Sequence, residues 1–236
     1  MHTIKHIYEP ERLFLCWQAP IERKRSRYVI AELRKKENEY SFRYLSDTVD
    51  FDEAKKLGFT IYPAFRDVNK EHTVGVIEAF SRRIPPRSRN DFKEYLKNFR
   101  LPYDIQISDF ALLGYSGAKL PSDGFSIINS LENVCVPSEF LIELAGTRYI
   151  KGLDLSFIEV GMQVEFIAEP KNPHDKNAIY VVVDRKKIGY INRVQTAGFQ
   201  QWMREGEICF EATIERTNGS KERPIVYLFL QIFKKK

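Results

Sequence analysis

The sequence predicts an α+β protein with two domains: a mixed α/β domain over residues 1–137 and a small β-barrel with one or two helices over residues 138–236. Three observations support this prediction. Helix-like and strand-like patterns both occur in the first half, whereas short strand-like patterns dominate the second half. Pro137 stands between the halves, where proline can stiffen a short linker. The 236 residues are enough for two small domains.

Three strands and three helices are expected in the N-terminal half. Residues 13–17, 28–33 and 40–45 are apolar or alternate between apolar and polar, and a basic turn over residues 22–27 separates the first two. The helices are expected near residues 50–57, 92–99 and 108–113. Their candidate N-cap residues are Asp50, Asp91 (or Asn90) and Ser108. This half therefore mixes α and β structure.

Strand-like patterns follow one another closely in the C-terminal half. They cover residues 140–144, 164–168, 178–183, 187–191, 208–215 and 225–233, and a helix is expected over residues 193–205. Asn218-Gly219 lies between the last two strands and is the strongest short hairpin signal in the chain. About six strands around one helix predict a small, partly open barrel.

Composition and charge narrow the classes of function. The hydrophobic share of 43% and the charged share of 29% are typical of a globular protein. A net charge of +5 permits a polyanionic partner, but the excess is spread thinly over both halves, so any such site must be a local patch. The cysteines are odd in number, widely spaced and set among apolar neighbours, which predicts buried reduced thiols at Cys16, Cys135 and Cys209.

No catalytic residue, cofactor or metal site is expected. The chain has no Gly-rich phosphate loop, no Gly-x-Ser-x-Gly elbow and no His-Glu-x-x-His motif, and its histidines lack metal-ligand spacing to a cysteine. His174 and Asp175 are an acid–base pair only in principle, because adjacent residues on a turn rarely face one substrate. We expect a cytoplasmic protein without a membrane partner, since no signal-peptide layout and no run of about 18 apolar residues occurs.

The most distinctive stretch covers residues 169–183, Glu-Pro-Lys-Asn-Pro-His-Asp-Lys-Asn-Ala-Ile-Tyr-Val-Val-Val. Proline sets the backbone angle of a turn, and Asn and Asp side chains bond neighbouring amides. This stretch therefore predicts a tight polar loop leading into a strand. Either all its polar groups serve the turn, or part of them bind a ligand. The density of donors and acceptors favours the second interpretation.

Together with Gly146-Thr147-Arg148-Tyr149 and Ile188-Gly189-Tyr190-Ile191-Asn192-Arg193, this stretch resembles the HIRAN domain, a small β-barrel module similar in shape to an OB fold. The resemblance covers about residues 138–236. It implies non-enzymatic binding of single-stranded DNA, at a 3′-hydroxyl end. The DNA-binding residues that it implies are Arg148, Tyr149, Asn172, His174, Asp175, Tyr190 and Arg193.

The resemblance also implies a role for each side chain. Asp175 would accept a hydrogen bond from the terminal hydroxyl and would repel a 3′-phosphate. Tyr149 would stack on a base. Arg148 and Arg193 would hold backbone phosphates, so that affinity should fall as salt rises.

Two positions depart from the DNA-binding example of the family. His174 stands where that example has tyrosine, which gives a smaller stacking surface that can carry charge below neutral pH. Asn192 stands where it has lysine, which removes one possible phosphate contact. For Tyr149 and Tyr190, ordinary packing within the barrel is the alternative interpretation.

A looser resemblance concerns the N-terminal half. Residues 12–18, 79–84 and 112–117 are similar to the N-terminal subdomain of HipA-type proteins, which implies a contact with a protein partner and no catalytic residue. We expect the chain to act as a recognition arm in DNA repair, a mobile element or phage defence. The alternative is a protein–protein interaction module of a bacterial defence or toxin–antitoxin-like system. A nuclease in the N-terminal half is a third, weaker hypothesis.

Overall fold

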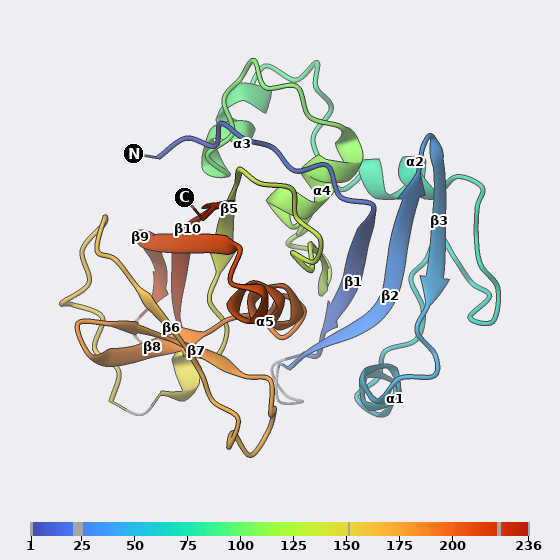
Figure 1. The fold of residues 1–236 in the computed structure, drawn as a ribbon. Coiled ribbons are helices and arrows are strands. Elements are labelled where there is room, and N and C mark those ends of the chain that lie inside the picture. The colour runs from blue at the N-terminus through green and yellow to red at the C-terminus, as the bar shows by residue number, and fades with distance from the viewer. Residues whose placement is uncertain (1, 21–25, 151, 221–222, 236) are drawn as a thin grey trace. The chain divides into compact units, whose positions relative to one another are not determined.

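The computed structural model describes residues 2–20, 26–150, 152–220 and 223–235 (Figure 1). The chain forms two compact units. The N-terminal unit consists of Glu9–Phe99 and Tyr103–Ser130; the C-terminal unit consists of Leu131–Lys236 with two additional pieces, Met1–Tyr8 and Arg100–Pro102. The division into domains at residue 137 stays a prediction. All strand pairs within the described sheets are antiparallel, and helices accompany them, as expected for the α+β class.

The N-terminal unit contains a four-stranded sheet in the order β3-β2-β1-β4. The three predicted strands are confirmed as β1 (Arg12–Gln18), β2 (Arg27–Lys36) and β3 (Glu39–Tyr44), which form a meander. β4 (Phe125–Ile128) returns from far along the chain and pairs with β1. The predicted basic turn lies mostly outside the described residues.

Four helices belong to this unit: α1 (Val49–Lys56), α2 (Val76–Ser81), α3 (Phe92–Asn98) and α4 (Asp109–Ser116). The Ser108 cap is confirmed, because its hydroxyl oxygen accepts from the Ala111 amide at 3.0 Å. The expected Asp50 cap is wrong. Thr48 caps α1, and the Asp50 carboxylate instead accepts from the Val29 amide at 2.9 Å. The short helix α2 was not predicted, and it has no hydrogen bond from a side-chain cap.

An aromatic cluster fills the core of the N-terminal unit. Phe42 on β3 is fully buried, and its ring centroid lies 4.6 Å from that of Phe65 and 5.7 Å from that of Phe80. The Tyr44 hydroxyl donates to the Phe65 carbonyl at 2.6 Å and accepts from the Tyr62 amide at 2.7 Å. Rings packed this closely bury a large apolar area and fix the loop between α1 and α2 against the sheet.

One arginine is buried beside this cluster. Arg83 donates to both carboxylate oxygens of Asp123, at 2.8 and 2.9 Å, and to the Ala118 and Phe125 carbonyls at 2.9 and 3.2 Å. A buried guanidinium needs such partners, because an unpaired charge in the interior is costly. Arg83 thus ties α2 to the segment that leads into β4.

The C-terminal unit contains two three-stranded sheets. One has the order β5-β10-β9 and the other β6-β7-β8. All six predicted strands are confirmed: β5 (Ser138–Glu143), β6 (Glu165–Ala168), β7 (Ile179–Val183), β8 (Lys186–Tyr190), β9 (Ile208–Ser220) and β10 (Arg223–Lys234). Isolated bridges Ala145↔Tyr190 and Gln163↔Thr213 join the sheets. The expected barrel is not closed: among the described residues these bridges and a hydrogen bond from the Gly161 amide to the Ile214 carbonyl at 2.8 Å join the sheets without a continuous ladder.

The hairpin between β9 and β10 does not turn at Asn218-Gly219, so that prediction is wrong. Both residues lie within β9 and pair with Ile225 and Pro224, and the ladder continues to the pair Ser220↔Arg223. Residues 221–222 lie outside the described residues. A glycine is required at 219 for another reason: its φ is +88°, and a Cβ there would lie 2.1 Å from the Arg223 carbonyl oxygen.

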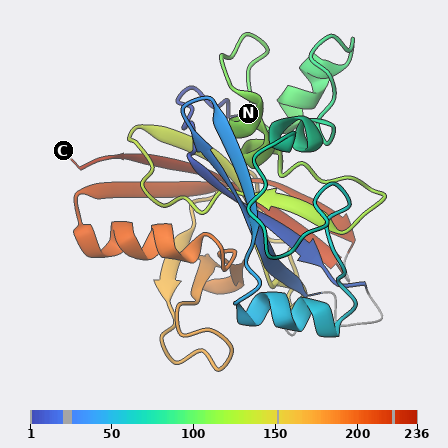
Figure 2. The same cartoon turned by 90° about the vertical axis from the view of Figure 1, so that its right-hand side faces the viewer.

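The predicted helix is confirmed as α5 (Thr196–Glu205), which lies alongside β9 (Figure 2). Phe199 and Trp202 face the sheet and are buried, with ring centroids 5.3 and 5.5 Å from that of Phe210. Gly198 permits a close approach of the helix to the chain before β5, because a Cβ there would lie 2.5 Å from the Leu131 carbonyl oxygen.

The first residues of the chain pack against the C-terminal unit. Ile4 is fully buried and its amide donates to the Arg100 carbonyl at 2.8 Å. The amides of Lys5 and His6 donate to the Glu139 carboxylate on β5, at 2.5 and 3.2 Å. These bonds explain why segments 1–8 and 100–102 belong to this unit rather than to the N-terminal unit.

The cysteine prediction is only partly correct. Cys16 is buried and all three thiols are free, but Cys209 is half-buried and Cys135 is exposed. Cys135 lies in the loop before β5, where the neighbouring Val134 takes the buried position instead. Over the part of the chain that the structure describes, no helix combines the length and the apolar character needed to cross a membrane.

Candidate functional site

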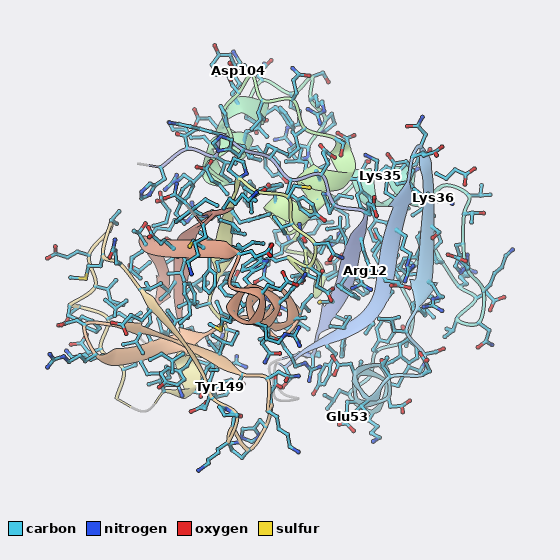
Figure 3. The ribbon with its side chains drawn as sticks, viewed as in Figure 1. Arg12, Lys35, Lys36, Glu53, Asp104 and Tyr149 are labelled. Carbon is cyan, nitrogen blue, oxygen red and sulfur yellow. The ribbon has the colours of Figure 1, made fainter. Side chains whose placement is uncertain are left out.

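Two of the predicted site residues lie in a short 3-10 turn, η2 (Thr147–Tyr149), after β5. Gly146 opens the turn with φ +72°, and the buried Thr147 hydroxyl donates to the Pro224 carbonyl at 2.8 Å. With Thr147 anchored, Arg148 and Tyr149 are exposed, the latter by 65% (Figure 3). The Arg148 guanidinium carbon lies 4.6 Å from the centroid of the Tyr149 ring. The turn therefore presents an aromatic ring with a cation attached to it.

Three further site residues lie in the loop between β6 and β7. The Asn172 side-chain oxygen Oδ1 accepts from the backbone amides of His174 and Asp175, at 2.9 and 3.1 Å, and its side-chain Nδ2 donates to Glu169 at 2.6 Å. Asn172 therefore builds the loop, as the turn interpretation predicts. His174 is exposed and Asp175 is half-buried.

Asp175 differs from Asn172 in how its polar atoms are used. Its Oδ1 accepts from the Asn177 amide at 2.8 Å, which fixes the orientation of the carboxylate. Its Oδ2 has no hydrogen-bond partner among the residues that the structure describes. A fixed carboxylate with one remaining oxygen is suited to accept a hydrogen bond from a ligand.

Tyr190, at the end of β8, connects the turn with the loop. Its hydroxyl donates to Glu169 at 3.1 Å and lies 3.5 Å from the Asn172 side-chain nitrogen. Its ring packs on Gly146, where a Cβ would approach the ring to 3.1 Å. The structure therefore brings Tyr190, Asn172 and the start of η2 together. Arg193 is exposed three residues beyond Tyr190.

Glu169 and Lys187 lie at the centre of these contacts and were not predicted as site residues. The hydrogen bond from Asn172 lowers the pKa of Glu169, and bonds from Lys187 and Tyr190 lower it further. The Lys187 ammonium lies 3.0 Å from Glu169 and over two rings, 4.5 Å from the Tyr180 centroid and 4.3 Å from the Tyr190 centroid. Along β6 the available signal was period-two alternation, because it places Glu165, Ile167 and Glu169 on one face. Lys187 lies three residues before Tyr190 and shares its face only through the register shift between Val181 and Val182 in the β7–β8 pairing, which alternation along β8 does not predict.

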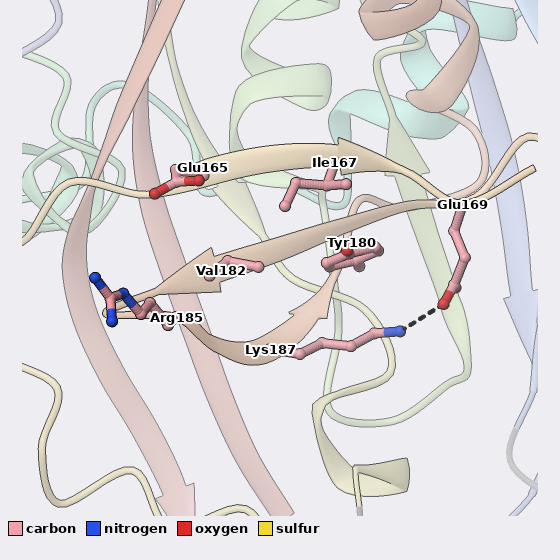
Figure 4. Close-up of a pocket in the computed structure, with 7 residues that line it drawn as sticks. All are labelled: Glu165, Ile167, Glu169, Tyr180, Val182, Arg185 and Lys187. Atoms are coloured by element: carbon pink, nitrogen blue, oxygen red, sulfur yellow. Dashed lines mark hydrogen bonds and ion pairs between the residues drawn. The ribbon is translucent and has the colours of Figure 1, made fainter.

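An open pocket of about 500 Å³ lies on the same face of the β6-β7-β8 sheet (Figure 4). Its lining residues are Glu165, Ile167, Glu169, Tyr180, Val182, Arg185 and Lys187. Glu169 belongs both to this pocket and to the contacts around Tyr190. Within the described ranges, no three His, Cys, Asp or Glu side chains are grouped so that they could hold a metal ion.

Comparison with known proteins identifies the part of the chain that holds this site. Residues 138–231 match the HIRAN domain family. This HIRAN segment runs from the start of β5 into β10 and contains all seven predicted site residues. It also contains Glu169, Tyr180 and Lys187.

Two solved structures are similar to part of the chain. The crystal structure of the HIRAN domain of human HLTF is 18% identical; the alignment covers 41% of this chain and 77% of that one, with a TM-score of 0.34. A protein from Lactobacillus plantarum is 25% identical, with coverage of 39% and 91% and a TM-score of 0.34. No curated protein matches the chain. The matched family residues all lie beyond residue 137, so the HipA-type resemblance of the N-terminal half gains no support and stays a prediction.

Proposed function

We propose that the HIRAN segment binds single-stranded DNA at its 3′-hydroxyl end, and that the chain acts by binding without catalysing a reaction. The observation that carries the proposal is the Asp175 carboxylate, which the loop holds through one oxygen while the other keeps no partner within the described residues. The match of residues 138–231 to the HIRAN family supports a DNA partner.

The chemistry of Asp175 suits a terminal hydroxyl. A carboxylate oxygen accepts a hydrogen bond from a hydroxyl, and such a charge-assisted bond contributes about 1.5–3 kcal/mol. A 3′-phosphate at the same place would bring two negative groups together. The hydrogen bond from the Asn177 amide to the Asp175 carboxylate opposes rotation of the side chain away from the ligand, so this repulsion would persist.

The exposed turn η2 supplies contacts that do not depend on sequence. Tyr149 presents its ring to solvent, and a base stacked on such a ring contributes about 1–3 kcal/mol. Arg148 beside it, and Arg193 beyond β8, are exposed, and we assign to them contacts with backbone phosphates. His174 adds a smaller exposed ring on the loop. Tyr190 and Asn172 hold η2 and the loop together, and we assign them positioning roles as well as contact with DNA.

Fluorescence anisotropy with the full chain tests this function. Two short labelled strands of one sequence, ending in a 3′-hydroxyl or a 3′-phosphate, are titrated with wild type, Asp175→Asn and Asp184→Asn. Asparagine at 175 keeps one acceptor oxygen for the Asn177 amide, removes the charge and replaces the second carboxylate oxygen by an NH2 donor. Asp184 is an exposed aspartate on the β7–β8 turn, so its variant controls for the loss of one negative charge.

We expect wild type and Asp184→Asn to prefer the hydroxyl end about tenfold or more, and Asp175→Asn to lose that preference. Affinity of the wild type for the hydroxyl strand should fall as salt rises. Equal binding of both ends by wild type would contradict end recognition. Absence of binding to either strand would contradict DNA binding altogether and favour a protein-interaction module.

A further inference from the structure

The pocket on the β6-β7-β8 sheet continues directly from the candidate end-binding site. In the strand register Tyr190 pairs with Tyr180, and Tyr180 pairs with Ile167. These three residues form one row across the sheet. The next row is Lys187, Val182 and Glu165, and Arg185 follows on the turn between β7 and β8. The two rows are about 7 Å apart, a step of two residues along a strand.

The floor and the ends of the pocket differ in chemistry. Tyr180, Ile167 and Val182 make an apolar floor in the middle (Figure 4). Lys187 and Glu169 pair with each other at one end, 3.0 Å apart, so their charges offset. Glu165 and Arg185 lie at the other end, and neither side chain has a hydrogen bond or ion pair within the described residues. The pocket therefore offers a guanidinium and a carboxylate that the protein itself does not use.

The turn that presents Arg185 is strained. Asp184 and Arg185 both have positive φ, +47° and +63°, in a two-residue connection where Asn-Gly is the favoured pair. A non-glycine residue in this region is disfavoured relative to glycine. Strained positions that persist cluster at functional sites, and Arg185 lies at the rim of the pocket.

We infer that this pocket binds the nucleotides that precede the 3′-terminal one, with the sugar and base on Tyr180, Ile167 and Val182 and a backbone phosphate at Arg185. The inference rests on the proposed function and extends it from one terminal nucleotide to a track across the sheet. An apolar floor between a stacking ring and a guanidinium is the arrangement that single-stranded nucleic acid requires. The Glu165 carboxylate repels phosphate from the β6 side and so keeps the backbone on the β8 side.

Oligonucleotides of two lengths distinguish binding along the track from binding at the end site. Dithymidylate and hexathymidylate, both with 3′-hydroxyls, are titrated against the full chain in wild type, Arg185→Gln, Lys186→Gln and Glu165→Gln. Lys186 is the matched control, because it is exposed on the same hairpin and its ammonium instead contacts the Phe157 ring, 4.1 Å from the centroid. Thermal melting of each variant verifies that its fold is unchanged.

We expect wild type to bind the hexamer more tightly than the dimer. Arg185→Gln should reduce this ratio severalfold and lower the salt slope of hexamer binding by about one, while dimer binding stays within about twofold. Glu165→Gln should raise hexamer affinity, and Lys186→Gln should leave the ratio within about twofold of wild type.

Two results would overturn the inference in different ways. An unchanged length ratio in Arg185→Gln, with intact binding of the dimer, would reject the track and leave the end site standing. A wild-type chain that binds neither oligomer would reject the proposed function and the track together.

Discussion

Aromatic rings have different roles in two regions of the molecule. In the N-terminal unit, Phe42, Phe65 and Phe80 are buried against one another and no ligand can reach them. On the β6-β7-β8 sheet, Tyr180 and Tyr190 remain half-exposed and contact an ammonium instead of further rings. A ring that is covered by other rings stabilises a core, whereas a ring that keeps one accessible face remains able to stack on a ligand.

The cations of the two regions show the same difference. Arg83 is buried and its donors are bound by Asp123 and two carbonyls, so it has a structural role. Arg185 is exposed at the rim of a pocket and has no partner within the described ranges. Burial and satisfied hydrogen bonds therefore separate the structural cations from those that can bind a phosphate, and the variants that follow test this separation.

The largest effect is expected from loss of the buried cation. Arg83→Met removes both bonds from Arg83 to Asp123 and leaves a partly buried carboxylate without its counter-charge, so the free energy of unfolding should fall by about 3 kcal/mol or more. Urea unfolding of the full chain measures the change. Arg82→Ala alters the neighbouring exposed arginine and should stay within about 0.5 kcal/mol of wild type. Equal effects of the two variants would contradict a structural role for Arg83.

The second-largest loss of stability is expected from removal of a buried hydroxyl. Tyr44→Phe leaves the Tyr62 amide and the Phe65 carbonyl without this partner, which should cost about 1–3 kcal/mol in urea unfolding. Burial raises the pKa of Tyr44 to about 12. Because the folded state holds this proton more tightly than the unfolded state, stability is complete below pH 10 and falls as pH rises towards 12. Tyr44→Phe should remove that part of the alkaline loss, and an identical alkaline profile in both proteins would contradict it.

Removal of an exposed tyrosine should weaken DNA binding and leave stability unchanged. Tyr149→Ala should weaken binding of a 3′-hydroxyl strand by about 1–3 kcal/mol, because a stacking surface is lost. Its unfolding free energy should change by less than about 0.5 kcal/mol, since the ring is 65% exposed. Tyr103→Ala, at an equally exposed tyrosine of the N-terminal unit, serves as the control and should change neither quantity. Anisotropy and urea unfolding measure the two effects, and a destabilised Tyr149→Ala would favour ordinary packing.

The smallest effect is expected in the stability at acid pH, and it concerns the Glu169 carboxylate. Hydrogen bonds from Asn172, Lys187 and Tyr190 hold its pKa below the ordinary value of 4.5, so the folded state favours the charged form. The stability from these bonds is present above pH 4.5 and is lost as pH falls through the lowered pKa. Carboxyl NMR titration should show this late protonation. Thermal melts of Glu169→Gln should depend less on pH in this window than those of wild type or Glu165→Gln.

The strands were the most predictable part of the fold. Alternation along β3, β9 and β10, and the apolar run of β7, are local properties, and all six C-terminal strands were found from them. The turn between β9 and β10 was misplaced because Asn218-Gly219 satisfies a local preference while the ladder continues through it. Thr48 replaced Asp50 as a cap because the Asp50 carboxylate bonds to β2, a contact between segments that no local pattern encodes.

The candidate site divides in the same manner. Turn chemistry predicted the polar loop, and the structure confirms the local bonds of Asn172 and Asp175. The sequence did not predict that Glu169, Lys187 and Tyr180 face one another, because no local pattern relates them. They meet only because β6, β7 and β8 pair in one register.

The sequence by itself determined the elements of this protein, the polar loop of residues 169–178 and the resemblance that points to DNA, since each depends on neighbours in the chain. Only the tertiary structure decided which polar groups are already used and which remain for a ligand. That distinction depends on contacts between segments far apart in the sequence: Asn172 with Tyr190, Thr147 with Pro224, and Arg83 with Asp123. Hydrogen bonding and burial are properties of the assembled chain, so they decide function where local pattern cannot.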